Sequence, residues 1–469
     1  DAAYSSLLQG PKRQFHNRIA DGLISKYPDV VANTPELVAS HLAKAERFSE
    51  AVDHWKDAGI RAKNASSNQE AIHYFQTALE SLKKEAASFS RDKLELELTA
   101  PLAHAMTALH GFSSPKTGAA YERAFQLTQN MDSPPEVFQI MYGLSTTRFM
   151  ADKFLDGLAI AKELASYSDT AGDKAGYTMA HRTYGGVVIW LPDYETSKMH
   201  LEKAIAAYDE LNSHRFIEEY GSDPKAISLV MLGIAHAYSG FPDQAATFVD
   251  KAMSHAEKLR FPFMTAWVHW MATWIFRDLN DVQQTEKHAT ALLQITLEKN
   301  ISPMKQAASI ICGWVEYRKN KPNSLETIEH AFKQLTDLGS VSFQELRHIV
   351  DYIDALTREN QIQKAKQKIE RALVLIETQG SKWNLPDILR RKAMCVLTDP
   401  QSNPIEAESI LLDSLELAKS QNAKLWELRS ANSLATLWGE KKERQRAYDL
   451  LFPIYDWYTE GFDTPILQE

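Results

Sequence analysis

The sequence predicts an all-α fold, a right-handed superhelical α-solenoid built from about ten helical hairpins. Three observations support this prediction. Glycine and proline number only 19 and 18 among 469 residues, so helix breakers are scarce along the chain. A pattern of small and apolar residues recurs with a period of about forty, the length of two helices and two turns. No run of residues has the alternation of apolar and polar side chains that marks a half-buried strand.

The repeat is anchored by a small or polar residue near the start of the second helix of each expected hairpin. We place these anchors at positions 71, 118, 157, 198, 244, 283, 326, 364, 407 and 446, between 38 and 47 residues apart. Segment 229–245 illustrates one unit. Its apolar first helix is expected to end at Gly240, and Pro242 and Asp243 are expected to begin the second helix.

One unit carries a familiar spacing of large and small residues. Trp55, Gly59, Ala71, Phe75 and Ala78 follow one another at intervals of 4, 12, 4 and 3. This spacing resembles the tetratricopeptide pattern. The resemblance implies that small residues let the two helices of a hairpin approach closely, while large residues fill the groove between units.

Further segments carry a resemblance: residues 1–8 followed by 13–20, residues 220–224 with 240–245, the latter with the sequence Gly-Phe-Pro-Asp-Gln-Ala, and residues 426–431 with 455–464. They resemble the tetratricopeptide C-terminal region of large bacterial signalling ATPases, which are often fused to class III adenylate or guanylate cyclases. The resemblance implies two parts. Residues 1–34 would be the end of a preceding winged-helix-like ATPase region, and residues 35–469 the tetratricopeptide-like solenoid.

Composition and motifs exclude several classes of function for this chain. It has no Gly-x-x-x-x-Gly-Lys-Ser/Thr loop, Gly-x-Gly-x-x-Gly, His-Glu-x-x-His or Cys-x-x-Cys. We therefore expect no catalytic residues, no cofactor and no enzymatic activity in this chain. The family resemblance implies that any ATPase or cyclase chemistry lies upstream of it. The net charge of −9 disfavours a nucleic-acid surface, which needs a basic excess.

The cellular setting is also indicated by the sequence. Only two cysteines are present, Cys312 and Cys395, too few for a disulfide framework, which favours a reducing, cytoplasmic location. The longest uncharged runs, 226–242 and 261–276, fall short of the roughly 20 apolar residues that a membrane-spanning helix needs. We expect no membrane contact.

A metal site is not predicted either, although the chain has 15 histidines. A metal needs three or four converging ligands, and no histidine has a partner one helical turn away that makes a clear site. His181 and His200 fall on different expected helices. Cys312 is expected to be a small buried hydrophobic residue rather than a nucleophile.

The candidate ligand contacts lie on the concave face of the expected solenoid. Trp267, Trp270 and Trp274 share one helix face by their spacing. The favoured interpretation is packing against neighbouring units, and the alternative is an aromatic lining of the inner groove that holds a peptide or small apolar ligand.

Three arginines, Arg148, Arg182 and Arg277, fall near the ends of expected first helices. They are candidate contacts for an acidic partner, with a solvated rim as the favoured interpretation.

The last helix, 443–458, is expected to cover the end of the array. Tyr448, Leu451 and Tyr455 form one stripe that should pack near Leu434 and Trp438. Gly461 is expected to end this helix in the left-handed conformation.

These observations predict a non-catalytic protein-interaction or sensor region that binds a peptide, a protein or a small effector on its concave face. Its partner could be the protein's own upstream ATPase or cyclase module. Two alternatives stay open: the effector-sensing solenoid of a transcription regulator resembling the maltose-regulon activator family, and a free-standing adaptor.

Overall fold

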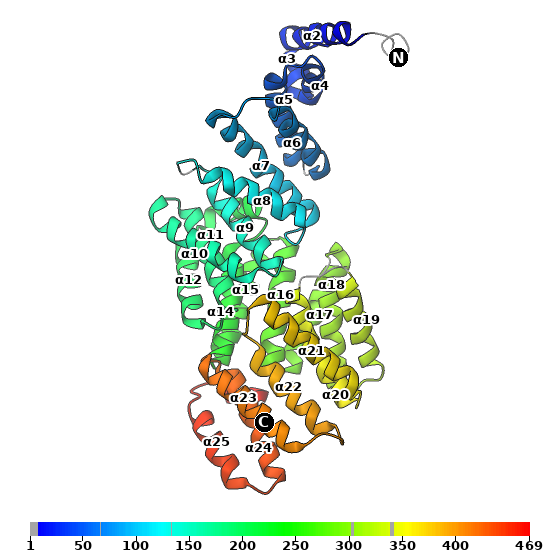
Figure 1. Cartoon of the computed structure of the whole chain (residues 1–469). Helices are drawn as coiled ribbons and strands as arrows, with labels where there is room; N and C mark the ends of the chain where they lie inside the picture. The colour runs from blue at the N-terminus through cyan, green and yellow to red at the C-terminus, as the bar shows by residue number, and fades with distance from the viewer. Residues whose placement is uncertain (1–7, 66, 133, 302–303, 338–341) are drawn as a thin grey trace. The chain divides into compact units, whose positions relative to one another are not determined.

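The computed structural model describes residues 8–65, 67–132, 134–301, 304–337 and 342–469. All regular elements in these ranges are helices (Figure 1). The helices form two compact units, residues 1–147 and 148–469. None of the described helices has both the length and the apolar content of a membrane crossing.

The first unit begins with a short three-helix segment and continues with longer helices. Its elements are α2 (Gln9–Lys26), α3 (Pro28–Asn33), α4 (Pro35–Lys44), α5 (Phe48–Asn64), α6 (Asn68–Leu82), α7 (Phe89–His110), α8 (Pro115–Thr128) and most of α9 (Val137–Met150).

The second unit contains the remaining helices. They are α10 (Phe154–Ala171), α11 (Lys174–Val188), α12 (Tyr194–Ala207), η1 (Glu210–Asn212), α13 (Ser213–Tyr220), α14 (Pro224–Tyr238), α15 (Pro242–Lys258), α16 (Pro262–Asp278), α17 (Val282–Lys299), α18 (Met304–Arg318), α19 (Ser324–Asp337), α20 (Ser342–Arg358), α21 (Ile362–Gln379), α22 (Leu385–Thr398), α23 (Pro404–Ser420), α24 (Lys424–Glu440), α25 (Arg444–Asp456) and α26 (Pro465–Gln468).

The predicted period of the repeat is confirmed. Each of the ten anchors lies within the first five residues of a helix, namely α6, α8, α10, α12, α15, α17, α19, α21, α23 and α25. Most of these helices pack against the helix before them as a hairpin, for example α5 with α6 and α14 with α15. The chain is therefore an all-α solenoid of helical hairpins.

The unit with the tetratricopeptide spacing packs as that pattern requires. Trp55, Ala71, Phe75 and Ala78 are buried between α5 and α6. A Cβ atom on Gly59 would lie 2.5 Å from the ring of Phe75, so only glycine allows this close approach.

The tight turn within a hairpin has one recurring geometry. Its second-last residue has a positive φ, as at Gly240 (92°), Asn280 (60°) and Asn360 (56°). The next amide then donates back to a carbonyl five residues earlier, as from Asp281 to Phe276 at 2.8 Å. Glycine and asparagine are the residues that tolerate this left-handed conformation best, so the turn is encoded locally.

The first helices of the hairpins form a closed circuit in the second unit. Helices α14, α16, α18, α20, α22 and α24 each pack against the next, and α24 also contacts α14. The ring of Tyr238 on α14 lies 5.2 Å from that of Trp426 on α24, and both side chains are buried. Side chains therefore fill the inner face of these hairpins.

The prediction for the last helix is wrong in part. α25 ends at Asp456, and Tyr448 and Tyr455 are 57% and 44% exposed, so their stripe does not pack on α24. Ile454, on a neighbouring face of the helix, is buried instead. Gly461 has a φ of 77° as expected, but it lies beyond the end of the helix.

The expected boundary after residue 34 falls inside the first unit. There α2 packs on α4, and α4 packs on α5. Residues 1–7 lie outside the described residues. That 1–34 belongs to a preceding module stays a prediction.

Paired histidines join the two helices of two hairpins. The Nδ1 atoms of His181 and His200 are 2.6 Å apart, and those of His269 and His288 are 2.9 Å apart. Burial, and next the neighbouring imidazole, lowers the pKa of His200 to about 4 and that of His288 to about 3. Burial also lowers the pKa of His269 to about 4. Across the described residues, no three His, Cys, Asp or Glu side chains converge as metal ligands.

These pairs predict a loss of stability in mild acid. The unfolded chain protonates His269 and His288 near their ordinary pKa of 6.5, whereas the folded chain resists their protonation until about pH 4 or below. Unfolding therefore takes up protons, and the free energy of unfolding should fall by about 1–2 kcal/mol per buried histidine between pH 7 and pH 5.

Urea unfolding followed by tryptophan fluorescence tests this prediction in the second unit, which holds all the tryptophans except Trp55. The double variant His269→Asn, His288→Asn should lose less stability on acidification than the parent. The exposed control His330→Asn should behave like the parent. An equal acid response in all three proteins would contradict the prediction.

Candidate functional site on the inner face of the second unit

The structure buries three of the six candidate ligand contacts that the sequence indicated and leaves the other three half-buried. Trp270 and Trp274 on α16 are 3% and 2% exposed, and Arg277 is 4% exposed. Trp267 is half-buried on the same helix, and its ring lies 5.5 Å from that of Trp270. Arg148 and Arg182 are half-buried on α9 and α11. A ligand-binding role for these six residues stays a prediction.

Trp274 belongs to an aromatic cluster that joins several helices. Its ring lies 5.9 Å from Trp190, which follows α11, and 5.9 Å from Phe343 on α20. Trp190 also lies 5.2 Å from Trp383, just before α22. Edge-to-face and tilted contacts of this kind stabilise aromatic pairs beyond the area that they bury.

Arg347 on α20 lies within this cluster. Its guanidinium carbon is 4.7 Å from the ring centre of Trp274 and 5.4 Å from that of Trp383. One of its nitrogens donates to Asp278 Oδ2 at 2.9 Å and to the carbonyl of Trp274 at 3.1 Å. Tyr238 on α14 donates to the same Asp278 oxygen at 3.0 Å. Asp278 therefore connects α14, α16 and α20.

Ion pairs continue from this point across the inner face. Arg277 donates to both carboxylate oxygens of Asp351 on α20, at 2.8 and 2.7 Å, and to Asp278 at 3.0 Å. All three side chains are buried. Arg277 and Asp351 are 74 residues apart in sequence, so the pair holds two first helices that are not neighbours along the circuit.

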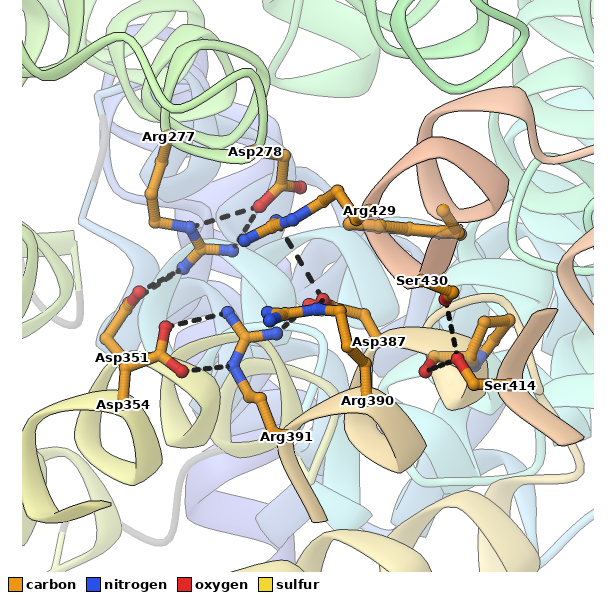
Figure 2. A network of polar contacts seen from close by, with 12 residues as sticks. Arg277, Asp278, Asp351, Asp354, Asp387, Arg390, Arg391, Ser414, Arg429 and Ser430 are labelled. Atoms are coloured by element: carbon orange, nitrogen blue, oxygen red, sulfur yellow. Dashed lines mark hydrogen bonds and ion pairs between the residues drawn. The ribbon is translucent and has the colours of Figure 1, made fainter. Parts of the chain in front are cut away.

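A second group of ion pairs joins α20, α22 and α24 (Figure 2). Arg391 forms a two-pronged pair with Asp354, at 2.8 and 2.9 Å, and also contacts Asp387. Asp387 accepts from Arg390 at 3.0 Å and lies 3.8 Å from Arg429. One buried carboxylate thus faces three guanidinium groups from two helices.

The pKa values reflect these charges. Burial alone would raise the pKa of the Asp278 carboxyl, but the charges of Arg347 and Arg277 outweigh it and hold that pKa far below its usual range. Burial, and next the charge of Arg429, lowers the pKa of Arg390 to about 10. The network is therefore ionised near neutral pH, and each charge depends on its partners.

The end of the chain closes the circuit. We call residues 457–469 the C-terminal strap. The ring of Trp457 lies 5.7 Å from Phe241 in the α14–α15 turn, and Tyr458 donates to the carbonyl of Lys424 at 3.0 Å. Ile466 is buried in the same apolar cluster as Trp274.

Polar contacts fix the strap on the start of α15. Glu460 Oε1 accepts from the amides of Asp243 and Gln244 at 2.9 and 3.0 Å. The amide of Gly461 donates back to Asp243 Oδ2 at 2.9 Å. A carboxylate at a helix N-terminus satisfies free amides and faces the positive end of the helix dipole. Two of the segments that carry the family resemblance, 240–245 and 455–464, therefore contact each other.

A groove of about 870 Å³ lies on the same hairpin, between α12, α14 and α15. Its apolar lining includes Leu229, Leu232 and Phe248, and charged residues of both signs border it. His255 lines one end and lies 3.1 Å from the buried carboxylate of Asp223. An apolar floor with a mixed polar rim suits a peptide or a small amphipathic molecule.

Sequence reasoning missed most of the network, including Arg347, Asp351, Asp278 and Arg391. One signal was available. Arg347 and Asp351 lie one helical turn apart among the apolar residues Leu346, Ile349, Val350 and Ile353, a placement that indicates buried charge. Their partners, however, come from distant hairpins.

Comparisons with known proteins support only coarse statements. No family model matches this chain. An uncharacterized protein of Rhizobium meliloti (strain 1021) is 20% identical over an alignment of 453 residues, which covers 93% of this chain and 42% of that protein. The chain thus spans less than half the length of that relative.

Solved structures similar to this chain are helical-repeat proteins. A Rap protein complexed with Competence and Sporulation Factor is 12% identical, covers 87% of this chain and 98% of its own, and has a TM-score of 0.47. A signal transduction ATPase with a tetratricopeptide repeat sensor, from Pyrococcus horikoshii, is 13% identical. The match covers 76% of this chain and 55% of the ATPase, with a TM-score of 0.40.

The buried pair between Arg277 and Asp351 predicts an asymmetric mutational response. Arg277→Met keeps the side-chain volume but leaves the Asp351 carboxylate buried without its main partner, so it should cost about 3–5 kcal/mol. Adding Asp351→Leu removes that charge and should restore most of the loss. Lys319→Met, which breaks a solvent-exposed pair with Glu286, should cost less than about 1 kcal/mol. Urea unfolding measures all three, and equal losses for the two single variants would contradict the account.

The strap predicts that Gly461 does not tolerate a side chain. Gly461 has a positive φ, and an added Cβ would lie 2.0 Å from Pro242 Cγ. Gly461→Ala should therefore unseat the strap, cost about 1–3 kcal/mol and speed hydrogen exchange at the amides of Asp243 and Gln244. Gly439→Ala is the matched control, since nothing lies within 4 Å of its added Cβ. Unchanged exchange in Gly461→Ala would show that the strap does not protect α15.

Proposed function

We propose that this chain is the non-catalytic interaction and sensor region of a larger bacterial signalling protein. Its catalytic modules, an ATPase, a nucleotide cyclase or both, would precede it. A peptide, a protein or a small effector is its ligand. The observation that carries this proposal is the closed circuit of first helices. Contacts between hairpins distant in sequence hold this circuit closed, so the array has a closed and an open arrangement between which a ligand can select.

In this proposal, the hairpin α14/α15 contacts both the ligand and the C-terminal strap that closes the circuit. One end of α15 receives Glu460 of the strap, and its remaining length borders the groove of about 870 Å³. A ligand in the groove contacts the helix that the strap caps. A ligand that binds one arrangement of this hairpin better than the other shifts the balance between the closed and the open circuit.

In this proposal, the predicted ligand contacts on the inner face are accessible only in the open arrangement of the circuit. With the circuit closed, Trp270, Trp274 and Arg277 are covered by other side chains. Release of the strap and of the ion pairs would expose them to a partner, for example the protein's own upstream module. The sensor would then report a ligand by exposing or hiding this surface.

Nucleotide turnover in the natural full-length protein tests the proposal. The 469-residue chain alone should neither hydrolyse ATP nor form cyclic nucleotides. In the full-length protein, Gly461→Ala should change the rate of nucleotide turnover several-fold, because it unseats the strap, whereas Gly439→Ala should leave the rate unchanged. Turnover by the isolated chain that a point mutation abolishes would contradict the proposal, as would a full-length rate insensitive to Gly461→Ala.

A further inference from the structure

An aromatic face of α25 is exposed to solvent. Tyr448, Phe452 and Tyr455 are 57%, 49% and 44% exposed, and Phe462 of the strap is 45% exposed. These rings are ordered against one another, since Tyr448 stacks on Phe452 at 5.3 Å and Tyr455 lies 5.7 Å from Phe462. Contiguous exposed aromatic residues mark interaction surfaces more often than scattered ones do.

This face is held on a rigid support. The neighbouring face of α25 packs against α24 and places Ile454 in the core, with Leu450 and Leu451 partly buried against it. The aromatic face, spaced by four and three residues, is therefore a second apolar stripe on a docked helix.

Charges at the two ends of the stripe have opposite sign. Arg444 lies one turn before Tyr448 on the same face, and Asp456 directly follows Tyr455. Among the described residues, neither side chain has a hydrogen bond or an ion pair. The other basic residue of the helix, Arg446, is already paired with Glu408 and Glu443.

We propose that this face binds the same face of a second copy of the chain, with the two α25 helices antiparallel about a two-fold axis. That arrangement stacks the aromatic stripes and places Arg444 of each copy beside Asp456 of the other. A stripe with a basic start and an acidic end is complementary to itself when reversed, as an isologous interface requires. A uniformly acidic or basic partner would leave one end unpaired.

The size of the surface sets the expected affinity. One pair of helices with their flanking aromatic residues buries less area than a typical stable interface of about 1,600 Å². Self-association is therefore reversible and depends on protein concentration in the micromolar range.

Sedimentation equilibrium of the full chain over a hundredfold range of concentration tests the proposal. The parent should pass from monomer to dimer. Tyr448→Ser with Phe452→Ser should weaken dimerisation by at least about tenfold, since it removes both stacked rings. Ile405→Ser, at an exposed apolar residue on α23, should leave it unchanged.

Charge complementation tests the antiparallel geometry. Arg444→Asp and Asp456→Arg should each weaken self-association, because each makes the two ends of the stripe alike in sign. Mixing the two variants should restore a dimer, since both ion pairs then form between unlike chains. A parent that stays monomeric at all concentrations would overturn the proposal, as would dimerisation indifferent to Tyr448 and Phe452 or a mixture that fails to associate.

Discussion

The pairing of arginines with buried aspartates across the inner face is the interaction on which the second unit depends. The carboxylate of Asp278 accepts hydrogen bonds from Arg277, Arg347 and Tyr238. Arg277 also donates to both carboxylate oxygens of Asp351. A charge removed from water is stable only beside its partner. The first helices must therefore lie in the one arrangement that satisfies every member of the network, even though such pairs contribute modest net stability.

The C-terminal strap also stabilises this arrangement of the first helices. It joins the last hairpin to α14/α15 through Glu460, and its apolar residue Ile466 enters the shared core. Most contacts in a solenoid join neighbouring repeats, so an open array bends easily. Here contacts between distant hairpins close the array, which turns gradual bending into a choice between a closed and an open circuit.

The fold was predictable because it depends on residues close together in the sequence. The site was not, because its contacts join residues far apart in the sequence. The ten anchors, Gly59 against Phe75 and the turns at Gly240 and Asn280 depend on residues close in sequence. The ion pairs and the strap join residues 74 and 217 apart, and one sequence does not reveal such pairings. The prediction for the last helix was wrong for another reason. It carries two apolar stripes, and periodicity alone does not say which one faces the core.

The distance between hairpins α14/α15 and α24/α25 tests the central claim, that the strap and ion pairs close the circuit. Spin labels at Asp250→Cys and Gln445→Cys, with Cys312 and Cys395 replaced by alanine, report this distance by double electron–electron resonance. The account predicts one narrow distance distribution, which broadens and lengthens when Gly461→Ala and Arg277→Met are added. A broad distribution in the parent, or one that those substitutions leave unchanged, would contradict it.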